Sequence, residues 1–119
     1  MALLSIPWWL PLGEVPEVPA TRLAQELTAS PPPQIVDVRT AREFRNGRIP
    51  GAISAPLGSL ARALPELGLD PGRRVVAICL TAHRSIPAVR LLRRHGFDAA
   101  QLRGGMLAWR AAGFREEKG

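Results

Sequence analysis

Short apolar runs alternate with stretches of helical periodicity along this chain. The runs typical of strands span 15–18, 35–38, 52–55, 75–78 and 99–102. Helical stretches span 21–29, 57–67, 85–95 and 106–112, and Thr40 is expected to cap a further short helix that runs through Phe44. The helix over 57–67 should break near Pro65. This alternation predicts an α/β domain, with a central, mostly parallel sheet of about five strands and helices on both faces.

The chain is divided into a short apolar segment, 1–14, and one domain, 15–119. A length of 119 residues is typical of a single domain that can bury its own core. The first segment carries no positive charge before Arg22, and Pro7 and Pro11 interrupt it. It therefore predicts neither a signal peptide nor a membrane-spanning helix. Trp8 and Trp9 are candidates for contact with a membrane interface or a partner, although such a segment more often packs on its own domain.

Positive charge dominates the composition. The formal net charge is +6, and Lys118 is the lone lysine among the basic residues. The arginines are scattered rather than gathered in one block, and no aromatic side chains are interleaved with them as a stacking surface. We expect solvated helix faces and a mild attraction for anionic substrates, and no nucleic-acid partner.

The only cysteine, Cys79, follows the strand 75–78, whose β-branched and uncharged residues predict a central strand buried on both faces. Ligands of open α/β sheets bind at the carboxyl ends of strands. The start of the helix at Ser85, the loop amides, the Arg84 charge and the hydroxyls of Thr81 and Ser85 should together favour a solvent-reachable thiolate at Cys79. The candidate substrate-binding residues are Leu80, Thr81, Ala82, His83, Arg84 and Ser85.

A single cysteine excludes an intrachain disulfide and a zinc site built from cysteines. It is consistent with a reducing compartment, and we expect a cytoplasmic protein without a metal. The alternative interpretation of Cys79 is a buried cysteine with a purely structural role, because free cysteine is among the most buried residue types. The spacing of six residues from Cys79 to Ser85, with Arg84 just before the serine, favours the functional interpretation.

At these residues the chain resembles the rhodanese-like domain family, over nearly everything from 15 to 114. Three groups of residues carry the resemblance: Asp37-Val38-Arg39 with Glu43-Phe44 and 47–52; Cys79 to Ser85; and Gly104-Gly105-Met106 with Trp109 and Gly113. The resemblance implies a rhodanese-like three-layer fold and a thiosulfate sulfurtransferase-like enzyme. In the reaction cycle that the resemblance implies, Cys79 takes a sulfur atom from a donor such as thiosulfate and holds it as a persulfide. It then passes the sulfur to cyanide or a thiol without a cofactor.

The resemblance also implies roles for residues around Cys79. Arg84 is expected either to bind the substrate anion or to organise the loop by bonding carbonyls or an acid such as Asp37, and the two roles remain open. Asp37 and Arg39 are expected to brace the loop by hydrogen bonds, and Glu43 to be a scaffold residue.

Four positions depart from the pattern of the family. Leu80 replaces a basic residue that many thiosulfate-using members carry, which puts thiosulfate as the physiological donor in doubt. Ala82 replaces a frequent glycine and would be strained at positive φ. Arg48 replaces a frequent histidine. His83 is an addition that is either an exposed loop residue, the favoured interpretation, or a group that assists the thiolate.

Three functions compete. The first is a sulfurtransferase with a small anionic sulfur donor and a thiol or cyanide acceptor, and a sulfur-acceptor protein is a further candidate partner. The second is a cysteine phosphatase or arsenate reductase, which is disfavoured because such phosphatases have a loop one residue longer between cysteine and arginine. The third is a non-catalytic persulfide carrier, or a binding or regulatory module; modules of the latter kind usually lack the cysteine that this chain keeps.

Overall fold

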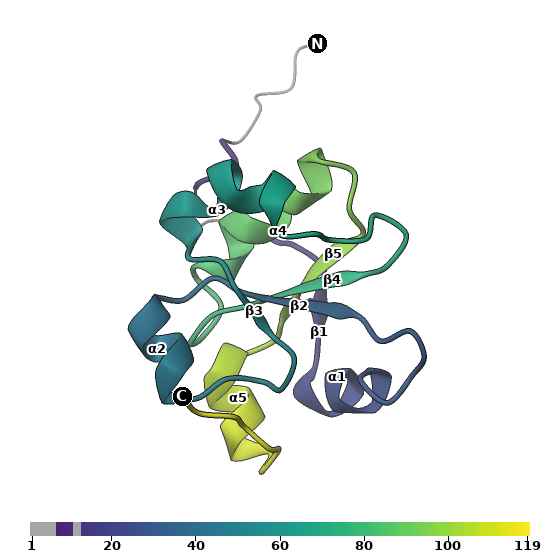
Figure 1. The fold of residues 1–119 in the computed structure, drawn as a ribbon, viewed down its shortest axis with the longest axis vertical. Coiled ribbons are helices and arrows are strands. Elements are labelled where there is room, and N and C mark those ends of the chain that lie inside the picture. Colours follow the sequence, from purple (N-terminus) through teal and green to yellow (C-terminus); the bar gives the residue numbers. More distant parts are fainter. Residues whose placement is uncertain (1–6, 11–12) are drawn as a thin grey trace.

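The computed structural model describes residues 7–10 and 13–119 and contains a five-stranded sheet in which every neighbouring pair is parallel (Figure 1). The strands are β1 (Glu17–Val18), β2 (Gln34–Asp37), β3 (Ile53–Ser54), β4 (Val75–Ile78) and β5 (Ala99–Leu102). Their order across the sheet is β1-β5-β4-β2-β3. The α/β prediction is confirmed, and β4 lies at the centre of the sheet.

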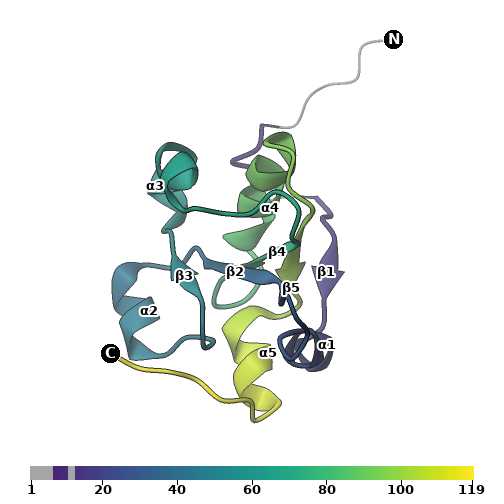
Figure 2. The ribbon, with the colours of Figure 1, turned by 45° about the vertical axis from the view of Figure 1, so that its right-hand side comes forward.

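Helices cover both faces of the sheet. They are α1 (Ala20–Glu26), α2 (Ala41–Asn46), α3 (Leu57–Ala63), α4 (Ser85–Arg94) and α5 (Gly105–Ala111), with a 3₁₀ helix η1 (Leu64–Glu66) after α3. Figure 2 shows α3 and α4 on one side of the sheet and α1 and α5 on the other. Each pair covers its own buried cluster, one containing Leu60 of α3 and Ala88 of α4, the other Leu23 of α1 and Trp109 of α5. The domain therefore has three layers.

The burial of β4 on both of its faces explains why its sequence is a continuous apolar run. Val75 and Ala77 pack in the cluster under α3 and α4, whereas Val76 and Ile78 pack in the cluster under α1 and α5. Successive side chains of a strand point to opposite faces, so a strand covered on both sides must be apolar at every position. Cys79, the next residue, continues this alternation on the α3 and α4 side.

Element boundaries follow the local chemistry. Strands 75–78 and 99–102 have the predicted limits, whereas the two edge strands are shorter than predicted, at two residues each. Helix α1 ends at Glu26 rather than at 29, because Thr28 turns back onto the Gln25 carbonyl through both its amide and its hydroxyl. Thr40 caps α2 as predicted, and the helix continues to Asn46. The predicted break near Pro65 falls in η1, which begins at Leu64 and has Pro65 as its second residue.

The described part of the N-terminal segment packs partly on the domain. Trp8 lies against the cluster under α3 and α4, and Arg90 of α4 donates a hydrogen bond to the Leu10 carbonyl. Trp9 remains 59% exposed. The expectation for Pro11 and the first six residues lies outside the described residues. Within the described ranges, no helix is both long and apolar enough to cross a membrane.

Candidate active site

Cys79 lies at the carboxyl end of β4, directly before the loop that leads into α4. Its thiol is free, and the residue is only 1% exposed. The side chain packs in the same cluster as Val38, Leu60 and Ala88. The position at the strand end is as predicted, but the expectation of a solvent-reachable sulfur is wrong for this conformation, because the loop and the helices on that face close over it.

The sulfur faces a chain of polar side chains that leads from buried Ser85 and Gln101 to exposed Glu17. Cys79 Sγ lies 3.5 Å from Ser85 Oγ, which lies 2.6 Å from Gln101 Oε1. Gln101 Nε2 in turn donates to Glu17 Oε2 over 3.0 Å. Ser85 and Gln101 are both buried, at 0% and 4% exposure. Sequence reasoning did not identify Gln101 or Glu17; the signal was a lone polar residue inside the otherwise apolar strand 99–102.

Arg84 is held by Glu43 of α2. Its two terminal nitrogens donate to the two carboxylate oxygens over 2.6 and 2.9 Å, which is the bidentate geometry of a strong arginine–carboxylate pair. The acidic partner of Arg84 is therefore Glu43 rather than Asp37. This pairing accords with the loop-organising role, and the role in binding the substrate anion stays a prediction.

Glu43 is fixed from two directions. Besides binding Arg84, its Oε1 accepts from the Thr40 amide, while the Glu43 amide donates to Thr40 Oγ1 in a complete capping box. The hydrogen bonds from Arg84 lower the pKa of Glu43 from 4.5 to about 2 against the opposing effect of partial burial, and the Thr40 amide contributes further. The same pairing raises the pKa of Arg84. Glu43 is thus the scaffold residue that the sequence suggested.

Asp37, the last residue of β2, and Arg39, two residues further on, form a buried ion pair. Arg39 Nε and one terminal nitrogen donate to the two Asp37 oxygens over 2.9 and 2.7 Å, and that terminal nitrogen also reaches the Gly47 carbonyl at 2.7 Å. The residues are 0% and 1% exposed. Among the described contacts, neither side chain bonds to the 79–85 loop. The expectation that the pair braces that loop directly is wrong, since it ties β2 to the end of α2 instead.

The backbone carbonyls at the start of the loop bond to helix α5, whereas the backbone amides of the loop have no protein partner among the described residues. The carbonyls of Cys79 and Leu80 accept from the amides of Met106 and Leu107, at 2.9 and 3.1 Å. No acceptor in the described chain receives a hydrogen bond from the amides of 80–84. Amides without a protein partner suit an anion or water, as the predicted anion-binding loop requires.

Gly105 permits the close approach of α5 to this loop. It has φ +58°, and a Cβ there would lie 2.6 Å from the Leu80 carbonyl oxygen and still closer to the carbonyls of Cys79 and Thr81. Only glycine can combine that backbone conformation with that contact. The Gly-Gly turn of the sequence is therefore part of the support of the Cys79 loop.

The remaining loop residues differ in exposure. Thr81 and His83 are exposed, whereas Leu80 and Ala82 are half-buried. No described residue other than glycine has positive φ, so Ala82 carries no strain of that kind. His83 has the exposed position that we favoured for it.

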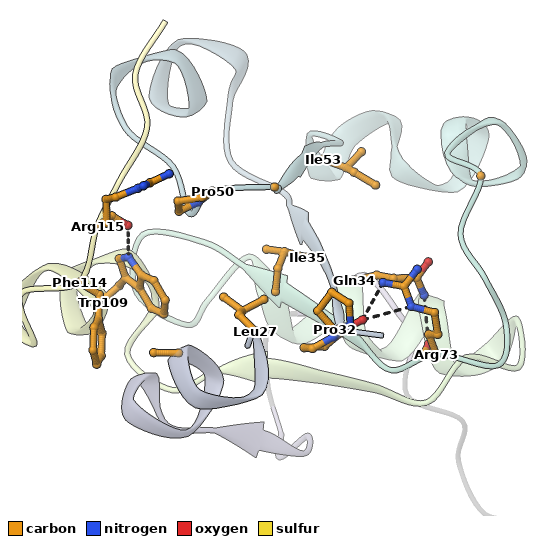
Figure 3. Close-up of a pocket in the computed structure, with 14 residues that line it drawn as sticks. Leu27, Pro32, Gln34, Ile35, Pro50, Ile53, Arg73, Trp109, Phe114 and Arg115 are labelled. Atoms are coloured by element: carbon orange, nitrogen blue, oxygen red, sulfur yellow. Dashed lines mark hydrogen bonds between the residues drawn. The ribbon is translucent and has the colours of Figure 1, made fainter. Parts of the chain in front are cut away.

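A cavity of about 560 Å³ lies away from Cys79. Figure 3 shows Leu27 and Ile35 between Trp109, Phe114 and Arg115 at one end and Pro32, Gln34 and Arg73 at the other. Gln34 and Ile35 begin β2, at the edge of the sheet opposite to the carboxyl end that bears Cys79. No residue of 79–85 lines this cavity.

A second hollow, of about 530 Å³, adjoins the Cys79 loop. Ala82 lines it together with Glu17, Gln101 and Arg103. It therefore gives solvent access to the far end of the polar chain that begins at Cys79. No group of three metal-ligating side chains occurs among the described residues.

The comparisons with known proteins agree with one another. The family model described as "Rhodanese-like domain" matches residues 20–112. The chain is 42% identical over 87 residues to the HTH-type transcriptional regulator Rv0324 of Mycobacterium tuberculosis, covering 71% of this chain but only 38% of that protein. It is 33% identical over 96 residues to a sulfurtransferase of Allochromatium vinosum, covering 80% and 88% of the two chains. The crystal structure of a rhodanese-like domain protein from Staphylococcus aureus matches with a TM-score of 0.73 and 33% identity, over 80% of this chain and 91% of that one.

Proposed function

Because this chain belongs to the rhodanese-like domain family, we propose that it is a sulfurtransferase that carries sulfur on Cys79 as a persulfide. The observation that carries the proposal is the place of the single cysteine, at the carboxyl end of the central strand and before the start of α4. The relative from Allochromatium vinosum, named a sulfurtransferase, supports the same activity.

The proposed reaction has two steps. The Cys79 thiolate, formed by loss of its proton to solvent, attacks the outer sulfur of a donor such as thiosulfate. The new sulfur–sulfur bond forms as the donor's own sulfur–sulfur bond breaks, and sulfite leaves with the electron pair. A thiol or cyanide then attacks the terminal sulfur of the persulfide, and Cys79 departs as the thiolate. One cysteine is sufficient for this ping-pong scheme.

The residues of the loop have distinct parts in this proposal. The amides of 80–84 have no protein acceptor in the described chain and can stabilise the anionic thiolate and persulfide. The start of α4 adds a partial positive charge. Arg84 keeps the loop in place through Glu43, so it acts as a positioning residue rather than as the residue that binds the substrate anion.

The burial of Cys79 adds a requirement. At 1% exposure the sulfur cannot meet a donor in the conformation described, so sulfur transfer requires the 80–84 loop to open. A sulfur sealed in every conformation would exclude catalysis. The proposal therefore includes loop opening as a step before the first attack.

Intact-protein mass spectrometry tests the proposal directly. After incubation with thiosulfate, or separately with a small persulfide donor, the wild-type chain should become heavier by one sulfur atom. Cys79→Ser is the matched control and should stay unmodified. Loading from the persulfide donor alone would identify a different donor class. No added sulfur from either donor would contradict the sulfurtransferase proposal and favour a binding module.

A further inference from the structure

Ser85 has one hydroxyl proton and three acceptors around it. Its Oγ lies 2.6 Å from Gln101 Oε1, 3.2 Å from the Ala82 carbonyl and 3.5 Å from Cys79 Sγ. A hydroxyl donates one hydrogen bond and accepts up to two. The question that decides the chemistry at Cys79 is therefore which neighbour receives the Ser85 proton.

Glu17 decides the orientation of the Gln101 amide. A carboxylate only accepts hydrogen bonds, so the group 3.0 Å from Glu17 Oε2 must be the amide nitrogen of Gln101. The opposite orientation would place two acceptor oxygens face to face. Arg103 Nε also donates to the other oxygen of this carboxylate, Glu17 Oε1, over 3.4 Å. Gln101 Oε1 consequently faces Ser85, and the short contact between them requires the hydroxyl to donate.

We infer that Gln101 is a positioning residue for Cys79: by taking the one proton of Ser85, it leaves a serine lone pair facing the sulfur, which stabilises the thiolate less than a donating serine would. The inference rests on the proposed function: a less stable thiolate matters only if Cys79 attacks a sulfur donor, because a thiol attacks more slowly than a thiolate. When Cys79 ionises, Ser85 can stabilise the anion only by breaking its bond to Gln101.

The charges around Cys79 are mostly paired or distant, and they act on the sulfur together with this hydrogen bond and the loop amides. The charged or titratable groups on the surrounding elements are Glu17 on β1, Asp37 at the end of β2 and Arg39 after it, Arg42, Glu43 and Arg45 on α2, Arg62 on α3, His83 and Arg84 in the loop, Arg90, Arg93 and Arg94 on α4, Arg103 after β5, and Arg110 on α5. The three acids among them are paired with arginines, Glu43 with Arg84. His83 and Arg62 are exposed, and the three α4 arginines lie beyond its first turn.

The thiol pKa of Cys79, measured from the ultraviolet absorbance of the thiolate as pH is raised, tests the inference. The chain is suited to this titration, because it has one cysteine and no tyrosine. Gln101→Met keeps an unbranched side chain of similar length but removes the acceptor. The freed Ser85 hydroxyl can then donate to the thiolate, whose full charge makes it a stronger acceptor than the Ala82 carbonyl, and we expect the thiol pKa to fall by about one unit. An unchanged or higher value would overturn the inference.

Ser85→Ala supplies a second test that does not depend on the folding of the Gln101 variant. If Ser85 accepts from the thiol, its removal should not raise the thiol pKa; if Ser85 donates to the thiolate in the resting protein, the pKa must rise, and the inference fails. In the Ser85→Ala background, Gln101→Met should have no further effect. A fall that persists there would mean that Gln101 acts through general polarity instead of through Ser85.

Circular dichroism on each variant confirms that the titrated protein is folded. The titration is independent of sulfur loading, so its result and that of the mass measurement can fail separately. A wild type that takes up sulfur, combined with an unchanged pKa in Gln101→Met, would reject the positioning role alone. A wild type that takes up no sulfur, combined with the expected pKa shifts, would reject the transferase proposal alone.

Discussion

The ion pair between Glu43 and Arg84 should contribute measurably to stability at neutral pH. The pKa of Glu43 falls from 4.5 to about 2, or about 2.5 pH units, which sets a ceiling of about 3 kcal/mol. The side chains of Arg84 and Glu43 remain 36% and 28% exposed, so solvent screening reduces the interaction to about 1 kcal/mol. That amount is a sizeable part of the stability of a small domain.

A double-mutant cycle measures this interaction. The variants are Glu43→Gln, Arg84→Met and the pair, with unfolding by urea followed by tryptophan fluorescence. Glutamine at position 43 can still complete the capping box with Thr40, so the change isolates the contact with Arg84. We expect a coupling free energy of about 1 kcal/mol at neutral pH.

The pH dependence of the coupling provides the refuting result. A carboxyl whose pKa is lower in the folded state contributes its full stability when the pH is above its pKa in the unfolded state. That contribution is lost as the pH falls through its pKa in the folded state. For Glu43 this window runs from 4.5 down to about 2, so less than half of the coupling should remain at about pH 3. A coupling below about 0.3 kcal/mol, or one equal at neutral and acidic pH, would show that the pair does not hold the loop.

The same variants separate the two roles of Arg84 in sulfur loading. If Arg84 positions the loop, Glu43→Gln and Arg84→Met should slow loading from thiosulfate to a similar extent. If Arg84 binds the donor anion, removing the charge of Glu43 should leave loading intact or accelerate it, and only Arg84→Met should slow it. Loading rates by mass spectrometry distinguish these outcomes.

Two further predictions concern the support of the site. Gly105→Ala should destabilise the fold by about 2–4 kcal/mol, seen as a lower melting temperature, because it combines positive φ with a close contact to the Leu80 carbonyl; a melting temperature equal to that of the wild type would contradict this. Arg39→Met should cost about 3–5 kcal/mol in urea unfolding, because it leaves Asp37 charged and buried, and adding Asp37→Asn should restore part of the loss; a double variant no more stable than the single one would refute the charge argument.

Much of the fold could be predicted because its signals are local. The apolar run 75–78 has one interpretation, a strand buried on both faces, and the structure gives it those limits. The cap at Thr40 and the break at Pro65 depend on residues within one helical turn. The edge strands β1 and β3 were overestimated, because their length depends on how far their single neighbouring strand extends, which hydrophobic pattern does not report.

Only the part of the site that is contiguous in the sequence could be predicted. Cys79 and the loop to Ser85 follow one another in the sequence, but Glu43 and Gln101 reach them from 41 residues before Arg84 and 16 residues after Ser85. No periodicity links such positions, so the sequence offered Asp37 as the partner of Arg84 when the structure uses Glu43. The burial of Cys79 is likewise a property of packing that the loop sequence does not state.

The anchors of the loop indicate where it can open. Its first two residues are tied to α5 through the Cys79 and Leu80 carbonyls, and its last two are tied by Arg84 to Glu43 and by Ser85 to Gln101. Between these anchors, the side chains of 81–83 make no hydrogen bond in the described chain, and two of the three residues are exposed. A movement confined to 81–83 would break only the neutral contact of 3.2 Å between Ser85 Oγ and the Ala82 carbonyl. Opening this middle stretch therefore requires the least free energy to expose the sulfur. It leaves both ends of the loop, and the amides at those ends, in place for the reaction.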